Sequence, residues 1–264
     1  MHLSKFSKFV LVVMALAALS FIYVPLFVVT VNSFSTSMSM SWPPPGLTLD
    51  WWGKAFQSAG AMESVVTSLI VAAAASVIAL VLGTLLAFAL HRFSFFGKSA
   101  INLLVVLPIA LPGIVTGLAL NNVFKTVLEW QLGWATIIIA HATFCVVVVF
   151  NNVFARLKRH GTSLEEASSD LGAGIWTTFR LVTFPRIRSA LVAGGILAFA
   201  LSFDEIIVTT FTAGSGVETL PIFILNNMYR PNQAPIVAVI AVVMTVLSVL
   251  PIYFAEKLSA KDDR

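Results

Sequence analysis

Six long apolar runs constrain what this chain can fold into. They fall at residues 9–31, 64–90, 101–124, 134–154, 190–213 and 234–255. A helix needs roughly 20 apolar residues to cross a hydrocarbon layer about 30 Å thick, and each run supplies them. No run shows the polar and apolar alternation of a barrel strand, and backbone groups in lipid must pair within the segment itself. The sequence therefore predicts an all-α integral membrane protein with six transmembrane helices.

Composition supports one membrane domain covering residues 1–264. Charged residues make up 11% of the chain and apolar residues 58%, whereas a soluble domain carries about 25% charged residues. No segment outside the apolar runs is long enough to form a soluble domain. The net charge of +4 does not indicate a nucleic-acid binder, because the basic residues gather on no tail or amphipathic helix. The single cysteine, Cys145, lies inside an apolar run, so an internal disulfide is excluded.

The placement of lysine and arginine gives the helices a direction. Thirteen of the 16 basic residues lie at the two chain ends or in the second and fourth connecting loops; the opposite loops hold Lys54, Lys125 and Arg230. Because cytoplasmic loops carry the excess of positive charge, both termini are predicted to be cytoplasmic. The first run continues for about 23 residues, past any small-residue cleavage site, and we interpret it as a retained helix.

The fourth loop, residues 155–189, is the longest segment on the predicted cytoplasmic side. Ser163 and Glu166 have the spacing of a capping box, which predicts a helix from about Leu164. Gly172 and Gly174 then permit a turn, and a second short helix is expected before Pro185 ends it. Exposed apolar residues on two such helices suit docking to a partner, and a helix lying on the inner membrane surface is the alternative.

This loop resembles the EAA loop of bacterial ABC importer permeases. Glu166-Ala167-Ser168, three residues, Gly172, nine residues and then Val182-Thr183-Phe184-Pro185 keep every spacing of that pattern. The departures are the conservative ones at Ser168, Val182 and Phe184. The resemblance implies the type I importer (MetI-like) permease fold and a coupling helix that enters a cleft of an ATP-hydrolysing subunit. The coupling residues that it implies are Glu166, Ala167, Gly172, Ile175, Phe179 and Pro185, with Glu166 and Gly172 shaping the turn and the apolar face of Ile175 and Phe179 buried in the ATPase.

Other segments are similar to the spermidine/putrescine subfamily, and within it to the second permease of the pair. They include Leu107–Gly113, His141–Cys145 and Leu201–Glu205. The resemblance implies a transport subunit and not an enzyme, in a bacterial inner (plasma) membrane. Its implied partners are a sister permease, two ATP-binding subunits and a periplasmic or extracellular solute-binding protein. ATP and magnesium would be bound by the partners, with no cofactor or metal on this chain. A permease for another small solute, such as an amine or a phosphonate, is the alternative.

Four polar residues inside the predicted spans are candidate pathway residues. Asp204 and Glu205 lie in the fifth span and offer negative charge to a cationic amine, with a structural or gating role as the alternative. Adjacent positions on a helix point about 100° apart, so one of the two is expected to face the pathway. His141 is interpreted first as a neutral hydrogen-bonded link between helices, over a proton or substrate role. Asn121 fits either helix packing or substrate contact.

Three other interpretations are weaker. Gly97-Lys98-Ser99 imitates the end of a phosphate-binding loop, but Arg92 stands where the first glycine is required. No His-Glu-x-x-His motif is present for an intramembrane protease. An ion-coupled secondary carrier would need its own relay of buried charges, and it leaves the fourth loop unexplained.

Overall fold

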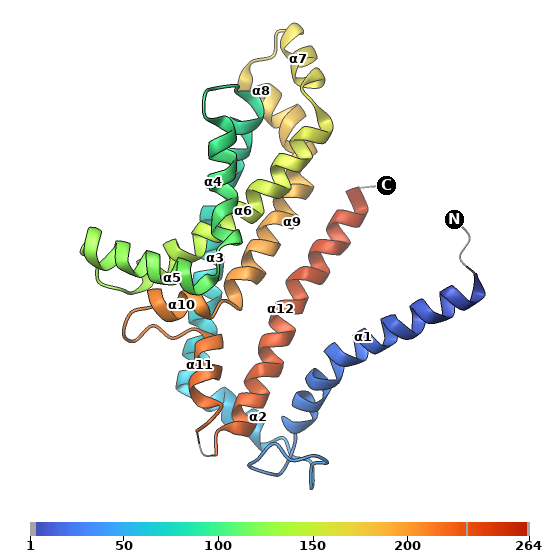
Figure 1. Cartoon of the computed structure of the whole chain (residues 1–264), viewed down its shortest axis with the longest axis vertical. Coiled ribbons are helices and arrows are strands. Elements are labelled where there is room, and N and C mark those ends of the chain that lie inside the picture. The colour runs from blue at the N-terminus through green and yellow to red at the C-terminus, as the bar shows by residue number, and fades with distance from the viewer. Residues whose placement is uncertain (1–3, 231, 263–264) are drawn as a thin grey trace. The chain divides into compact units, whose positions relative to one another are not determined.

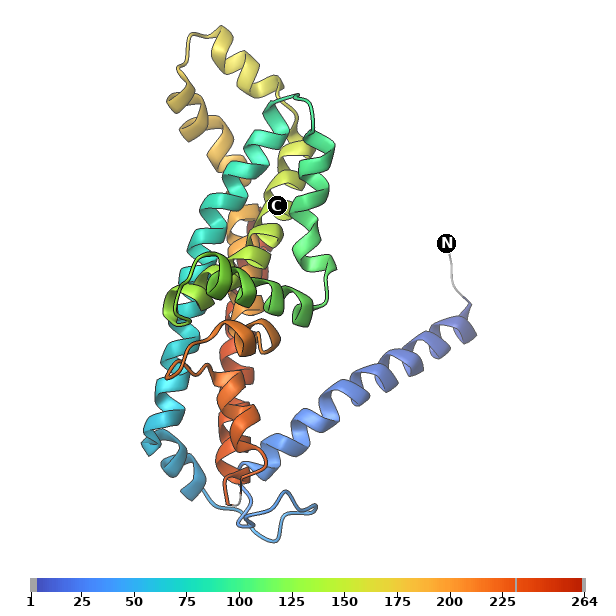
Figure 2. The same cartoon turned by 60° about the vertical axis from the view of Figure 1, so that its left-hand side comes forward.

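The computed structural model of this protein describes residues 4–230 and 232–262, with the side chains of residues 160, 251–252 and 254–262 left aside. Within these residues every regular element is a helix, and one isolated bridge joins Ser35 to Leu47. The chain divides into two compact units (Figures 1 and 2). The first holds the described residues up to Met62 together with Ile224–Val246. The second holds Glu63–Phe223 and the described residues from Leu247 onward.

The helices follow the apolar runs of the sequence. In chain order they are α1 (Lys5–Asn32), α2 (Asp50–Gln57), α3 (Ala59–Arg92), α4 (Lys98–Ala110), α5 (Gly113–Asn122), the π-helical turn η1 (Val123–Val127), α6 (Trp134–His160), α7 (Ser163–Asp170), α8 (Ile175–Thr178), the π-helical turn η2 (Phe179–Thr183), α9 (Phe184–Phe203), α10 (Ile207–Thr212), α11 (Leu220–Asn227) and α12 (Ala234–Asp262). Among the described residues, four helices are long and apolar enough to cross a membrane, and a bent pair makes a fifth candidate. A further apolar helical stretch, Ala234–Leu250 of α12, is too short to count as a candidate span, so the described residues give four or five of the six predicted spans.

The third predicted span is not one straight helix. α4 and the helix that begins at Gly113 meet at an angle of 107°. Pro112 directly precedes α5, and Leu111 has the extended backbone (φ −81°, ψ 143°) that a residue before proline prefers. The break lies in the middle of the run 101–124 that was predicted to be one span.

The fifth predicted span, 190–213, is wrong at both ends. The helical run starts at Ile175, passes through η2 and ends at Phe203, and Asp204–Ile206 separate it from α10. Pro185 does not end the second helix of the loop as predicted. It lies in the first turn of α9, after a π-helical turn, where a missing backbone N–H is tolerated.

The second unit is built around α6, which packs against α9, α10 and α4. Glycines permit the closest approaches: a Cβ on Gly83 of α3 would lie 2.8 Å from the Val146 carbonyl oxygen of α6. A Cβ on Gly117 of α5 would lie 2.7 Å from the ring of Phe211 in α10. In lipid, helices associate by such close van der Waals contact, so these glycines are packing sites between helices.

In the first unit, the loop between α1 and α2 is fastened by its aromatic residues. The indole nitrogen of Trp51 donates to the carbonyl oxygen of Ser35 at 2.8 Å, and the rings of Phe34 and Trp52 stack at 5.3 Å. Apart from Asn32 at its end, α1 has no buried residue. Its apolar surface is thus free for lipid or for another helix.

Candidate functional site

The two short helices α7 and α8 with their connecting turn form the first part of the candidate site. α7 begins at Ser163, and Thr162 is its N-cap residue. The Thr162 hydroxyl donates to a carboxylate oxygen of Glu166 at 2.6 Å. The predicted capping box of Ser163 and Glu166 is wrong: Thr162 is the N-cap residue, its side chain makes no capping hydrogen bond to the backbone, and Glu166 instead accepts from the Thr162 hydroxyl. Glu166 and Ala167 are both exposed.

Gly172 ends α7 in a left-handed conformation, with φ +82°. The amide of Ala173 donates to the carbonyl of Ser168 at 3.1 Å, and the amide of Gly172 donates to the carbonyl of Ser169 at 2.9 Å. These two bonds define a Schellman motif, in which glycine is strongly preferred because a Cβ strains the backbone. The structure thus gives the predicted turn at Gly172 a specific geometry, and Gly174 starts the next helix with an ordinary φ of −70°.

Glu165, which the sequence analysis did not single out, fastens this loop to the rest of the second unit. Its carboxylate forms an ion pair with Arg92 at the end of α3, with 2.5 Å between Nη2 and Oε2. The hydroxyl of Thr183 donates to its other oxygen at 2.6 Å. Burial alone would raise the pKa of Glu165, but the hydrogen bonds from Thr183 and Arg92 and the Arg92 charge outweigh it and hold that pKa below its ordinary value. No local sequence signal separates Glu165 from Glu166, because both partners of Glu165 are distant in the chain.

Large apolar side chains project from the turn. Leu171 is 90% exposed, Ile175 83% and Trp176 72%. Phe179 does not join them: it is half-buried, and its ring lies 6.0 Å from Phe88 of α3. The prediction placed Ile175 and Phe179 together on one docking face. In the structure Ile175 is exposed together with Leu171 and Trp176, whereas Phe179 packs against α3, so Ile175 and Phe179 do not share one exposed face.

A groove of about 530 Å³ runs beside the exposed tip. Its lining residues are Leu164, Ala167, Ser168, Leu171, Leu181, Val182, Pro185 and Arg186. The predicted coupling residues Ala167 and Pro185 thus share one surface feature. Leu164, Ala167 and Leu171 are spaced three and four residues apart, which puts them on one helix face, and all three line this groove.

The second part of the candidate site is the break between α9 and α10. A carboxylate oxygen of Glu205 accepts the amide N–H of Val208 at 2.9 Å and so caps the start of α10. Asp204 is exposed, and Glu205 is partly buried. The two acidic residues therefore differ in surroundings: Glu205 has a structural contact, and Asp204 is available to a ligand.

His141 of α6 is fully buried beside this break. Its Nδ1 lies 2.7 Å from the Ser202 hydroxyl of α9, and its Nε2 lies 2.8 Å from the Thr209 hydroxyl of α10. Thr209 already donates to the carbonyl of Glu205 at 2.8 Å. Since a hydroxyl has one proton, Nε2 of His141 is the donor to Thr209, and Nδ1 accepts from Ser202. His141 is thus a hydrogen-bonded link between helices, as the sequence analysis favoured.

Asn121 has a similar structural role at the far end of α10. Its side-chain amide donates to the carbonyl of Phe211. α5 and α10 lie side by side in both views (Figures 1 and 2). The interrupted third span therefore packs on the interrupted fifth, and of the four predicted pathway residues Asp204 is left as the exposed charge.

The family model for the inner membrane component of binding-protein-dependent transport systems matches residues 79–261. The chain belongs to this family. It is a multi-pass membrane permease, as predicted from its apolar runs and its fourth loop.

Relatives that share this family cover most of the chain. The putrescine transport system permease protein PotI of Escherichia coli (strain K12) is 33% identical over 82% of the permease described here and 79% of its own length. The spermidine/putrescine transport system permease protein PotC of Haemophilus influenzae is 30% identical over 92% of this chain and 94% of its own length. A putative 2-aminoethylphosphonate transport system permease protein, PhnV of Salmonella paratyphi A, is 28% identical over 95% of this chain and 94% of its own length.

Solved structures support the permease fold. A chain of a bacterial ABC transporter involved in the import of alginate matches with a TM-score of 0.70 and 15% identity, over 97% of this permease and 96% of that chain. A chain of the MetNI methionine ABC transporter, in inward-facing conformations, matches with a TM-score of 0.58 and 15% identity. The match covers 77% of this permease and 98% of that chain. At these identities the likeness concerns the fold, and it agrees with the MetI-like permease fold expected from the sequence.

Proposed function

We propose that this permease is the membrane-spanning subunit of an ATP-driven importer for polyamines such as putrescine and spermidine. Its identity of 30–33% with permeases of putrescine and spermidine/putrescine transport systems carries the proposal. Asp204 adds a chemical reason. A carboxylate exposed at a break between two helices attracts a cationic amine, and buried charges in membrane proteins commonly mark substrate pathways.

The proposal includes a division of labour between subunits. This chain forms half of the pathway with a sister permease, a solute-binding protein delivers substrate from outside, and two ATP-binding subunits hydrolyse ATP. No cofactor is assigned to this chain. The exposed apolar tip of Leu171, Ile175 and Trp176 is the surface that enters an ATPase subunit. The tip belongs to a loop rich in basic residues, which supports a cytoplasmic position for it and for both termini.

Uptake of labelled putrescine and spermidine tests this function. The permease, its sister, its ATPase and its binding protein are produced together in cells that lack polyamine uptake. ATP-dependent uptake is expected, and it should persist in right-side-out vesicles or proteoliposomes that are loaded with ATP when the proton gradient is collapsed. Loss of transport on collapse, with ATP supplied, would instead favour an ion-coupled carrier.

A 2-aminoethylphosphonate importer is the second candidate, because a putative permease for that solute is 28% identical over 95% of the chain. The two solutes differ in charge: a polyamine carries only positive charges, whereas an aminophosphonate also carries a phosphonate. Competition separates them. Unlabelled spermidine should abolish uptake of labelled putrescine, and an excess of 2-aminoethylphosphonate should leave it unchanged.

A further inference from the structure

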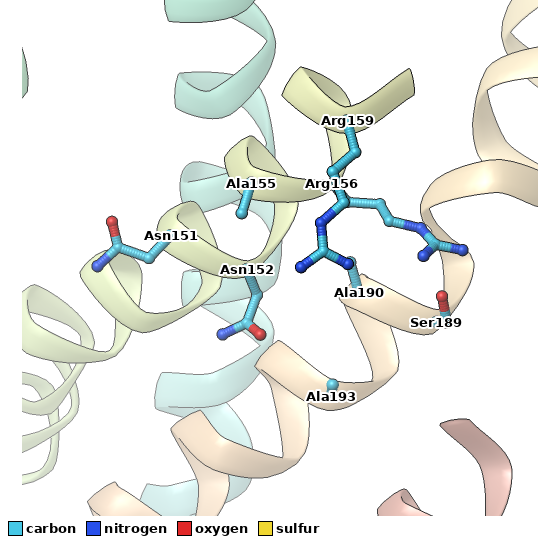
Figure 3. Close-up of a pocket in the computed structure, with 8 residues that line it drawn as sticks. All are labelled: Asn151, Asn152, Ala155, Arg156, Arg159, Ser189, Ala190 and Ala193. Atoms are coloured by element: carbon cyan, nitrogen blue, oxygen red, sulfur yellow. The ribbon is translucent and has the colours of Figure 1, made fainter. Parts of the chain in front are cut away.

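A polar pocket of about 370 Å³ lies between α6 and α9 in the second unit (Figure 3). Its lining residues are Asn151, Asn152, Ala155, Arg156, Arg159, Ser189, Ala190 and Ala193. The two arginine side chains extend from α6 toward the part of α9 that carries Ser189 and Ala190 (Figure 3). No apolar side chain larger than alanine lines the pocket.

The charge of this pocket is uncompensated within the described side chains. Nε of Arg156 donates to the carbonyl of Arg186 at 3.0 Å, which fixes the side chain and leaves its terminal nitrogens for a ligand. The ion pair found between described side chains joins Arg92 to Glu165, so neither pocket arginine has a carboxylate partner there. No acidic residue is among the lining residues. Two cations in one pocket attract anions and repel cations.

The depth of the pocket indicates water and not lipid. Asn151 and Asn152 lie within the apolar run 134–154, and Asn151 precedes Arg159 by eight residues, roughly 12 Å along a helix. Asn152 donates to the carbonyl of Val148, but the exposed Asn151 makes no hydrogen bond with any described residue. An exposed amide without a partner is strongly disfavoured in hydrocarbon.

The neighbouring groove on α9 has the opposite character. It measures about 640 Å³ and is lined mostly by large apolar side chains from α3 and α9, among them Leu80, Leu85, Phe184 and Leu191. That groove suits acyl chains or an apolar helix. The contrast between two grooves on the same helix indicates that α9 presents one face to lipid or protein and another to water.

The water-facing side of α9 leads to Asp204. Ser189, Ala193 and Ala200 follow one another at intervals of four and seven residues, and Asp204 comes four residues later. Residues at such intervals share one helix face. The pocket and the exposed carboxylate therefore lie at two ends of one helix face, which also carries the exposed Leu197 between Ala193 and Ala200.

We propose that this pocket is the water-filled cytoplasmic mouth of the translocation pathway, and that Arg156 and Arg159 make it selective for anions. The arginines repel a cationic substrate that has reached the cytoplasm and so disfavour its return. The second part of this proposal rests on the proposed polyamine function. The first part, a water-filled mouth that attracts anions, is independent of the substrate.

Cysteine accessibility tests the mouth in the complete transporter. Asn151→Cys and Ala193→Cys are made in separate variants, with Leu85→Cys in the apolar groove as the matched control. The native Cys145 is buried, so it contributes little background. Inside-out vesicles receive an anionic or a cationic membrane-impermeant methanethiosulfonate. Both pocket cysteines should react. The ratio of the anionic to the cationic reaction rate should be about tenfold higher than the same ratio for a free thiol in solution. Unreactive pocket cysteines, or equal reaction at Leu85→Cys, would overturn the assignment.

Charge removal tests the role of the arginines. Arg156→Gln keeps a donor for the Arg186 carbonyl, and Arg159→Gln removes the second charge. Each change should reduce the preference for the anionic reagent by about threefold. Because less charge then repels putrescine from the cytoplasmic side, the internal putrescine concentration that inhibits uptake should fall by about the same factor. An unchanged reagent preference would show that the arginines do not set the field of the mouth. If the pocket cysteines prefer the anionic reagent but the unmodified transporter takes up no polyamine, the polyamine substrate is refuted and the water-filled mouth stands. If polyamine uptake is found but the pocket cysteines do not react, the mouth is refuted and the substrate stands.

Discussion

Glu165 and Arg92 form an ion pair at 2.5 Å between residues 73 positions apart in the chain. The contact joins α7 to the end of α3, and Thr183 completes it from η2. Three helical segments thus meet at one carboxylate. The contact links the α7–α8 tip to α3 through Arg92, and to α9 through Thr183 of η2. The Glu165 contact is therefore a candidate for coupling movement of the tip to movement of the spans.

Replacing Glu165 by glutamine should loosen the loop. The change removes the ion pair and should cost roughly 1 kcal/mol of local stability, because Arg92 is partly exposed and solvent screens the charge. We expect the complete transporter to assemble, with less transport for each ATP hydrolysed. Paired measurements of uptake and ATPase activity in proteoliposomes check this. The matched control is Asp170→Asn, since Asp170 is an exposed acidic residue of the same helix; an equal loss in both variants would contradict a specific role for Glu165.

The same contact predicts a pH dependence. The pKa of Glu165 in the folded protein lies below its ordinary value of 4.5. A lowered pKa means that the stabilising contribution is fully present above about pH 4.5 and disappears as the pH falls through the lowered folded value. Hydrogen exchange of the α7 amides, corrected for intrinsic rates, should therefore accelerate on acidification below that point. In Glu165→Gln the corrected rates should be high throughout and insensitive to pH; a persistent pH response there would assign it to another group.

Gly172→Leu should uncouple ATP hydrolysis from transport. The backbone at Gly172 has φ +82°, and a side chain there costs roughly 1–2 kcal/mol of strain although the space around it is open. The turn should distort while the spans remain inserted. Gly174→Leu is the control, because Gly174 also has open space but an ordinary φ of −70°. Uptake and ATPase assays on both variants decide the matter, and normal transport by Gly172→Leu would refute the placement of the coupling turn.

Asp204→Asn should reduce polyamine uptake about fivefold to tenfold, equivalent to about 1.0–1.4 kcal/mol of lost attraction for the cation. Glu205→Gln should have a smaller effect, because the amide oxygen can still accept the Val208 N–H that caps α10. Initial rates of labelled spermidine uptake, normalised to assembled complex, measure both. Equal uptake by Asp204→Asn and the unmodified protein would remove Asp204 from the pathway.

His141→Ala should destabilise the break between α9 and α10. The change leaves the buried hydroxyl of Ser202 without its histidine partner and removes the donor to Thr209, which keeps its bond to the Glu205 carbonyl, at a cost of roughly 1–3 kcal/mol. Thermal unfolding of the purified transporter should shift downward. Thr143→Ala, two residues further along α6 and bonded within its own helix, is the control and should shift it little. A retained melting temperature in His141→Ala would contradict the assigned network.

Much of the candidate site was predictable because it depends on local sequence. Gly172 was recognised as a turn, and the spacing from Glu166 to Pro185 indicated the coupling loop. The assignments of Glu165 and Phe179 were missed because each is decided by a partner on α3, Arg92 and Phe88 respectively. Helical periodicity shows which residues share a face, but not which face meets another helix.

The sequence by itself determined that the chain is a helical membrane protein, which segments are apolar enough to span, and where the unusual loop lies. These properties follow from the transfer of apolar side chains into lipid and from backbone hydrogen bonds within each helix, both of which are local. The tertiary structure decided that the fifth span ends at Phe203 and that His141 links α9 to α10. It also decided that Arg156 and Arg159 meet Ser189 in one pocket. Those outcomes depend on contacts between helices distant in the chain, and such contacts are formed only when the helices pack.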